Sequence, residues 1–198
     1  MQTRTRATVG AGLLLVLALL AGLLWWVAAE RGLTARDLWE VVEPPPPEPC
    51  SETDPTADGT AGGCLTPTAL RLHDAAVARF GDPGRNAPIR SISCWSEHAW
   101  NPSSDHPKGR ACDFFPARSG EFPQGEDLAD GWAVADWLRA EARELDVRYV
   151  IWQGRIWYRG SADAADGWGR PYRGGGVYDP EDATGGHFDH VHVSVGRS

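Results

Sequence analysis

The sequence has no excess of basic side chains. Its 198 residues carry 19 Lys and Arg against 27 Asp and Glu, which gives a formal net charge of -8. Proteins that bind the phosphate backbone do so through a positively charged surface and the release of counterions. The charge balance therefore argues against a nucleic acid or an anionic lipid surface as the partner.

The sequence also shows no internal repeat with a period of about 20 to 50 residues, which argues against solenoids and propellers. A chain of this length has room for one ordinary domain plus appendages. Its hydrophobic content of 42% and its 10 Trp are sufficient for a core. We therefore expect one globular domain.

Acidic side chains are missing from the first 29 residues. Arg4 and Arg6 precede an uncharged apolar run over residues 8–29, which is long enough to cross a bilayer as a helix. A cleaved signal peptide is the alternative, although its apolar region usually spans only about 7 to 15 residues. We expect a cytoplasmic N-terminus at residues 1–7 and a transmembrane anchor at residues 8–29. The remainder is then extracellular, or secreted if the segment is cleaved.

Residues 43–63 contain no large aliphatic or aromatic side chain. Residues 43–49 read EPPPPEP, which favours a stiff polyproline spacer. Residues 51–63 read SETDPTADGTAGG and have too little apolar surface to offset the entropy lost on ordering. We therefore expect a Pro-rich and disordered stalk at residues 30–64 and a folded domain at residues 65–198.

The chain has only four cysteines, and an exported domain favours disulfides between them over free thiols. Three pairings are possible. Proximity in the sequence favours Cys50 with Cys64 and Cys94 with Cys112. The second bridge would contribute about 3 kcal/mol on the chain-entropy estimate.

Two amphipathic helices are predicted. The first has Thr66 as N-cap and Pro67 as first residue, and it ends at Gly81. The second covers residues 128–145, where apolar side chains follow three- and four-residue steps along one face.

Short runs rich in β-branched and aromatic residues predict strands, with Gln153 and Gly154 as a hairpin turn. The strands are expected at residues 89–95, 147–152, 155–158 and 191–195. Helices do not alternate with every strand, so we expect an α+β fold: an antiparallel sheet with flanking helices. The Gly-rich residues 159–186 should form a long irregular excursion.

Two segments have the chemistry of a metal site. SDHPKGRACD places His106 and Asp113 seven residues apart around a Gly-containing turn, and both are zinc-ligand types. GGHFDHVHVSV places His190 and His192 two residues apart in a strand, so that both rings point to one face. A catalytic zinc needs three protein ligands and an open position. His106, Asp113 and His192 supply three, and His190 is left beside the metal as a general base.

Residues 65–198 resemble the zinc D-alanyl-D-alanine carboxypeptidases and dipeptidases. Five positions fit the S-x-H-x-x-G-x-A-x-D motif of that family: Ser104, His106, Gly109, Ala111 and Asp113. Residues 190–192 are similar to the H-x-H motif of the wider superfamily, which includes lysostaphin-type endopeptidases, murein endopeptidases and the hedgehog signalling domain.

The resemblance implies a hedgehog/DD-peptidase-like fold with Zn²⁺ on His106, Asp113 and His192. His190 would assist the attacking water or stabilise the transition state. Ser104 would contact the substrate peptide, with a turn cap before Pro107 as the alternative. The implied reaction is hydrolysis of an amide bond in peptidoglycan stem peptides, by carboxypeptidase or endopeptidase action.

One departure leaves the function open. The carboxypeptidase branch commonly has a catalytic Glu just before its last zinc ligand, and His190 takes that place here. A non-catalytic, zinc-stabilised cell-wall binding or scaffold module is therefore the second hypothesis. A membrane-anchored disulfide domain whose histidines serve sensing or protein contacts is the third.

Other polar residues have secondary interpretations. His187 could supplement a ligand, although its odd spacing from His190 predicts that it faces away. Asp189 could orient a ligand imidazole, and Arg90 is the candidate for polarising the substrate carbonyl. We expect His98 to be an ordinary solvated or hydrogen-bonded side chain.

Overall fold

The computed structural model describes residues 48–56, 63–98, 100–101, 103–162 and 167–196. The chain divides into two units, Met1–Pro46 and Pro47–Ser198, and all described residues belong to the second. No helix within the described residues is long and apolar enough to cross a membrane. The predicted anchor at residues 8–29 lies outside them.

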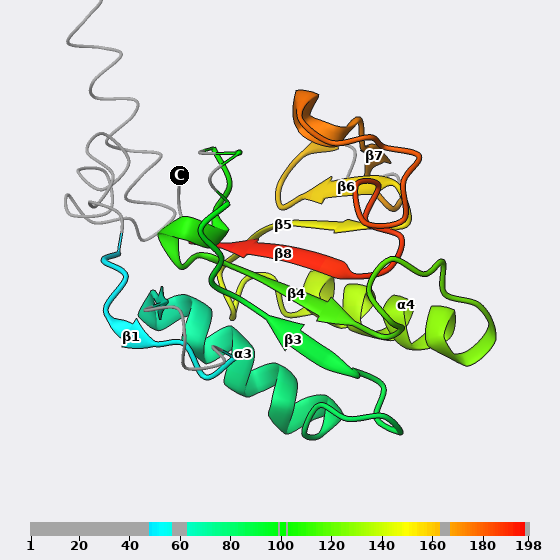
Figure 1. Ribbon diagram of the computed structural model, residues 1–198. Coiled ribbons are helices and arrows are strands. Elements are labelled where there is room, and N and C mark those ends of the chain that lie inside the picture. Colours follow the sequence, from blue (N-terminus) through cyan, green and yellow to red (C-terminus); the bar gives the residue numbers. More distant parts are fainter. Residues whose placement is uncertain (1–47, 57–62, 99, 102, 163–166, 197–198) are drawn as a thin grey trace, which may run out of the picture. The chain divides into compact units, whose positions relative to one another are not determined.

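The second unit is an α+β domain built on one six-stranded antiparallel sheet. The strand order is β3-β4-β8-β5-β6-β7, and Figure 1 shows this succession across the sheet. The strands are β3 (Ser91–Ser93), β4 (Ala111–Phe115), β5 (Val147–Trp152), β6 (Arg155–Tyr158), β7 (Arg170–Pro171) and β8 (Val191–Val195).

The first predicted helix is confirmed as α3 (Pro67–Phe80). The Thr66 hydroxyl accepts a hydrogen bond from the Ala69 N–H, as an N-cap does. Gly81 ends the helix with a φ of 88°, a backbone conformation that favours glycine.

The second helix, α4 (Gly125–Ala140), begins and ends earlier than the predicted residues 128–145. Ala142 and Leu145 are buried in turns that follow the helix. The apolar spacing of these two residues therefore reflects the burial of their side chains, although their backbone is not helical.

Three predicted strands, β5, β6 and β8, have the expected bounds. The hairpin turn between β5 and β6 is confirmed, with φ of 50° at Gln153 and 67° at Gly154. Strand β3 is shorter than the predicted residues 89–95. Strand β4 was not among the expected strands, and it carries Asp113.

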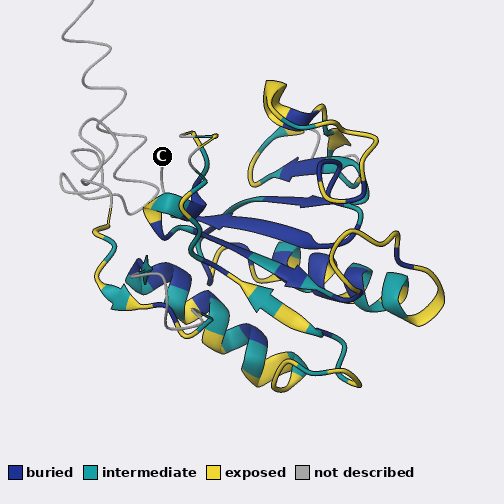
Figure 2. Ribbon diagram, viewed as in Figure 1, coloured by how far each residue is buried: buried dark blue, intermediate teal, exposed yellow. Residues whose placement is uncertain are grey.

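The two faces of the sheet have different roles. Alternate side chains of β4, β8 and β5 point into a core shared with α3 and α4, among them Phe114, Val193 and Val150. Figure 2 shows β8 buried along its length. The side chains between these, Asp113, His192 and Ile151, line a cavity instead. Strand alternation thus separates the core from the candidate site.

The folded part extends N-terminal of Leu65, where the sequence predicts the domain to begin. Strand β1 (Glu52–Thr53) pairs with β2 (Cys64–Leu65), and the side chain of Asp54 is buried. Residues 51–56 are thus ordered, although the sequence predicts a stalk there. Hydrogen bonds and a disulfide compensate for the lack of apolar side chains in this segment.

Both predicted disulfides are present. Cys50 is joined to Cys64, and Cys94 is joined to Cys112. The first connects the N-terminal segment to β2. The second connects Cys94, the residue after β3, to Cys112, the second residue of β4 and the one before Asp113.

Candidate metal centre

His106 begins a short 3₁₀ turn, η1 (His106–Lys108), just before β4. The Ser104 hydroxyl accepts a hydrogen bond from the His106 N–H at 3.3 Å, which supports the turn. Gly109 ends the turn with a φ of 64°, and a Cβ there would lie 2.4 Å from the Cys64 carbonyl oxygen. Only glycine fits this position of the motif.

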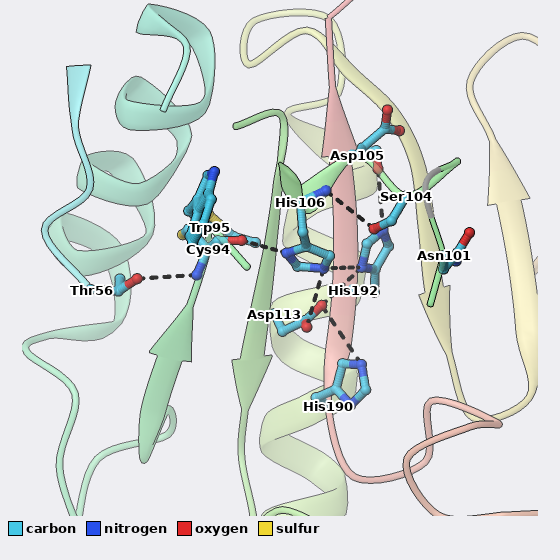
Figure 3. Close-up of polar contacts among 12 residues, drawn as sticks. Thr56, Cys94, Trp95, Asn101, Ser104, Asp105, His106, Asp113, His190 and His192 are labelled. Atoms are coloured by element: carbon cyan, nitrogen blue, oxygen red, sulfur yellow. Dashed lines mark hydrogen bonds and ion pairs between the residues drawn. A yellow bond between two sulfur atoms is a disulfide. The ribbon is translucent and has the colours of Figure 1, made fainter. Parts of the chain in front are cut away.

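Asp113 and His192 are direct partners across β4 and β8. The His192 Nδ1 lies 2.8 Å from Asp113 Oδ1, and the His106 Nε2 lies 3.3 Å from Asp113 Oδ2. Figure 3 shows these three side chains converging. One potential ligand atom from each lies within 4.8 Å of the others. The group could therefore hold a metal ion.

The tautomer of His106 fits such a site. Its Nδ1 contacts the carbonyl oxygen of Cys94, which can only accept, so this nitrogen carries the proton. The lone pair of Nε2 is then directed at Asp113 and at His192 Nδ1, 3.2 Å away. An imidazole with one nitrogen bound to a carbonyl and the other free is the usual form of a metal-binding histidine.

The protonation states also suit a cation. Burial by itself would raise the pKa of Asp113, but His106, His190 and hydrogen bonds hold that pKa well below its usual value. Burial lowers the pKa of His192, which favours the neutral ring that a metal requires. Burial also opposes protonation of His106, but Asp113 outweighs it and raises that pKa. A cation would compete with this proton.

His190 lies beside the three residues, immediately before β8. Its Nδ1 is 2.5 Å from Asp189 Oδ1, and its Nε2 is 3.6 Å from Asp113 Oδ1. Asp189 therefore contacts His190, the proposed general base, whereas the sequence suggested that it would orient a ligand imidazole. Burial opposes protonation of His190, but Asp113 and Asp189 together raise its pKa.

His187 contradicts the expectation that it faces away from the site. Its ring centroid lies 4.6 Å from that of His190 and 5.4 Å from that of His192. His187 ends a run of turns and has a φ of 56°, residues 188–190 are bends, and β8 begins only at Val191. Strand alternation therefore does not apply at this position.

His98 also lies closer to the site than the sequence suggests. Its ring stacks on His106 with a centroid separation of 4.8 Å and an interplanar angle of 8°. Arg90, in contrast, is bound to both carboxylate oxygens of Asp127 and to the Pro116 carbonyl. Among the described residues, Arg148 is the arginine that lines the cavity.

Sequence reasoning missed the buried carboxylate of Asp105. Arg110 and Arg148 each place a guanidinium nitrogen 3.0 Å from one of its oxygens, and the Tyr149 hydroxyl lies 3.3 Å away. The motif leaves this position unspecified, and Arg148 lies 43 residues away in the sequence. No local signal indicates the cluster.

The three candidate ligands, His187 and His190 line one cavity of about 370 Å³. Aromatic side chains make much of its wall, and the indole of Trp100 is two-thirds exposed beside it. The aromatic lining residues are Trp100, Tyr149, Tyr158, Tyr172 and Tyr178. The polar group thus opens into a pocket that is lined in part by aromatic side chains, of the kind that binds small ligands.

Fold and site define an α+β domain with a buried His-Asp-His group able to hold a metal. The family model of the VldE C-terminal domain matches residues 61–184, and the chain belongs to this family. The matched segment contains His106 and Asp113 and ends before His190 and His192. No curated protein and no solved structure matches the chain significantly.

Proposed function

We propose that this domain is a zinc peptidase that hydrolyses an amide bond in the stem peptides of peptidoglycan. The observation that carries the proposal is the convergence of His106, Asp113 and His192 at the wall of a cavity, with His190 beside them. The proposal also rests on the resemblance of their two motifs to the zinc D-alanyl-D-alanine carboxypeptidases and their superfamily. A hedgehog/DD-peptidase-like fold is part of it.

Two histidines and one carboxylate are the ligand types that zinc accepts, and three protein ligands leave one position open. When bound, zinc would polarise the scissile carbonyl and lower the pKa of a coordinated water to about 7. The ionised Asp113 and the free Nε2 of His106 supply donors that suit it.

The role of His190 follows from its two contacts. The Asp189 carboxylate holds the proton on Nδ1, so Nε2 is the atom that faces the site near Asp113. A ring fixed in this way can accept a proton from the attacking water and return it to the leaving amine.

Ser104 fits both sequence interpretations. Its hydroxyl accepts from the His106 N–H, as a turn cap would, and its side chain also lines the cavity. We propose that this wall, together with Tyr172 and Tyr178, contacts the substrate peptide.

The proposed location is the outer face of a membrane. The apolar run at residues 8–29 is the proposed single-pass anchor. Two disulfides in one small domain support an oxidising compartment. A cell-wall substrate would be within reach of a domain held there.

One observation favours the non-catalytic alternative, a zinc-stabilised wall-binding module. Within the described part of the chain, Asp113 is the only carboxylate among the residues that line the cavity. It is itself a proposed ligand, so no carboxylate of the described cavity wall is left for proton transfer, and the proposal assigns that role to a histidine, His190.

Metal content and muropeptide digestion, measured together on the full-length protein, test the proposal. We expect one zinc per chain and new peptide fragments, both lost in His192→Ala. His190→Ala should keep zinc and lose cleavage. His73→Ala, on α3, is the matched control. Zinc without fragments would favour the binding module, and wild-type protein without zinc would refute both readings.

A further inference from the structure

The segment just N-terminal of the predicted domain contacts the loop that leads to the candidate metal centre. The carboxylate of Asp54 is buried and accepts three hydrogen bonds. Its Oδ1 accepts from the N–H and the hydroxyl of Thr56, each at 2.8 Å, and its Oδ2 accepts from the Trp95 N–H at 2.8 Å.

Thr56 continues this set of contacts. Its hydroxyl donates to Asp54 and, through its oxygen, accepts from the Cys94 N–H at 3.1 Å. Two consecutive peptide N–H groups, of Cys94 and Trp95, are therefore held by residues 54–56. The disulfide to Cys112 holds the side chain of Cys94 against β4 at the same time.

The carbonyl of the same residue, Cys94, contacts Nδ1 of His106. Figure 3 shows the connection from Thr56 through Cys94 to His106. A carbonyl on one nitrogen determines both the tautomer and the orientation of an imidazole, and so directs the other nitrogen toward the metal.

We infer that Asp54 and Thr56 are positioning residues of the metal centre. Asp54 holds the peptide group that carries the Cys94 carbonyl, and Thr56 holds the peptide group before it, so that this carbonyl keeps Nε2 of His106 directed at Asp113 and His192. The inference rests on the proposed zinc site. It makes residues 54–56 part of that site, so we expect a piece beginning at Leu65 to bind zinc more weakly than the full chain.

The test is the zinc dissociation constant of the full-length protein, measured by competition with a chromophoric chelator. Thr56→Val removes the hydroxyl and keeps the shape of the side chain. It is expected to weaken zinc binding about 10-fold, the low end of the range for outer contacts of metal ligands. Asp54→Asn keeps one oxygen and should also weaken binding.

Two variants separate positioning from general loosening of the fold. Thr56→Ser keeps the hydroxyl and should restore most of the affinity. Thr53→Val is the matched control, since it makes the same change at an exposed position of β1. Thermal unfolding of each metal-free variant identifies a temperature at which all are folded, and affinities are compared there.

The inference would be overturned if Thr56→Val bound zinc as tightly as Thr53→Val. It would also be overturned if Thr56→Ser bound zinc as weakly as Thr56→Val. If Thr56→Val does not fold, the comparison of Asp54→Asn with Thr53→Val decides in its place. A wild-type protein that binds no zinc would instead refute the proposed function.

Discussion

The carboxylate of Asp189 lies 2.5 Å from Nδ1 of His190, while its second oxygen accepts from the Gly120 N–H and the Thr184 hydroxyl. The pKa of Asp189 is lowered, because hydrogen bonds and the charge of His190 outweigh the burial that would raise it. An ionised carboxylate only accepts, so His190 presents Nε2 to the site.

Asp189→Asn is expected to lower the rate of muropeptide cleavage without removing zinc. The amide no longer requires the proton on Nδ1, so His190 is less well oriented for proton transfer. We expect a loss of about 10- to 100-fold, less than the roughly 10²- to 10⁴-fold that a positioned acid or base contributes. Steady-state rates and metal analysis of the same samples measure the two effects.

Thr184→Val is the control for this change, since it removes one loop contact of Asp189 and leaves the contact with His190 in place. It should retain most of the activity. Loss of zinc in Asp189→Asn would contradict the assignment, because the carboxylate would then support the ligands rather than His190.

Asp105 should make the stability of the domain depend on acid pH. Burial alone would raise its pKa, but Arg148, a hydrogen bond with Ser194, Arg110 and Lys108 lower it. The folded pKa is thus below the unfolded value of about 3.9. The stabilisation is complete above the unfolded value and is lost as the pH falls through the folded one.

Asp105→Asn is therefore expected to lower Tm at neutral pH and to make Tm fall less steeply between about pH 5 and pH 3. Removing one partner of a buried ion pair costs about 3 kcal/mol. Asp146→Asn is the matched control, because the Asp146–Arg159 pair is about one-third exposed and such pairs contribute about 1 kcal/mol or less. If the Tm of Asp105→Asn and that of the wild type fell equally steeply over this pH range, the lowered pKa of Asp105 would be contradicted.

Gly131 should not tolerate alanine, although it lies inside α4. Alanine is usually favoured over glycine in a helix by about 1 kcal/mol. Here a Cβ would lie 2.1 Å from Cζ2 of Trp152, a fully buried side chain of β5. We expect Gly131→Ala to destabilise the domain by about 1 to 3 kcal/mol through overpacking.

Denaturant unfolding measures this effect, with Ala133→Gly at an exposed position of the same helix as the comparison. Ala133→Gly lowers the helix propensity at that position and creates no steric clash. If Gly131→Ala instead raised the unfolding free energy, the close packing of α4 against Trp152 would be disproved.

Elements with local signals could be predicted from the sequence. Thr66, Pro67 and Gly81 mark the ends of α3 through capping and backbone preferences that involve only neighbouring residues. Alternation and turn chemistry likewise identify β5, β6 and their hairpin. Strand β4 carries a weaker signal, because its short run ACDFF has a polar residue at the position that faces the cavity.

The residues of the candidate site also differ in whether a local sequence signal identifies them. The spacing of His106 and Asp113 and the pair His190 and His192 identified the group that the structure brings together. The prediction that His187 faces away from the site is wrong, because His187 lies in a turn and strand alternation does not apply there.

The local elements, the favoured cysteine pairs and the residues with metal-ligand chemistry could be predicted from the sequence, because each depends on neighbours or on a short spacing. The fold was needed to show that Asp113 faces His192, that Arg148 reaches Asp105, and that Thr56 contacts Cys94. These contacts depend on the strand order β4-β8-β5 and on the path of the N-terminal segment. Such pairings join residues far apart in the chain, and their energies are set by packing that no local stretch of sequence encodes.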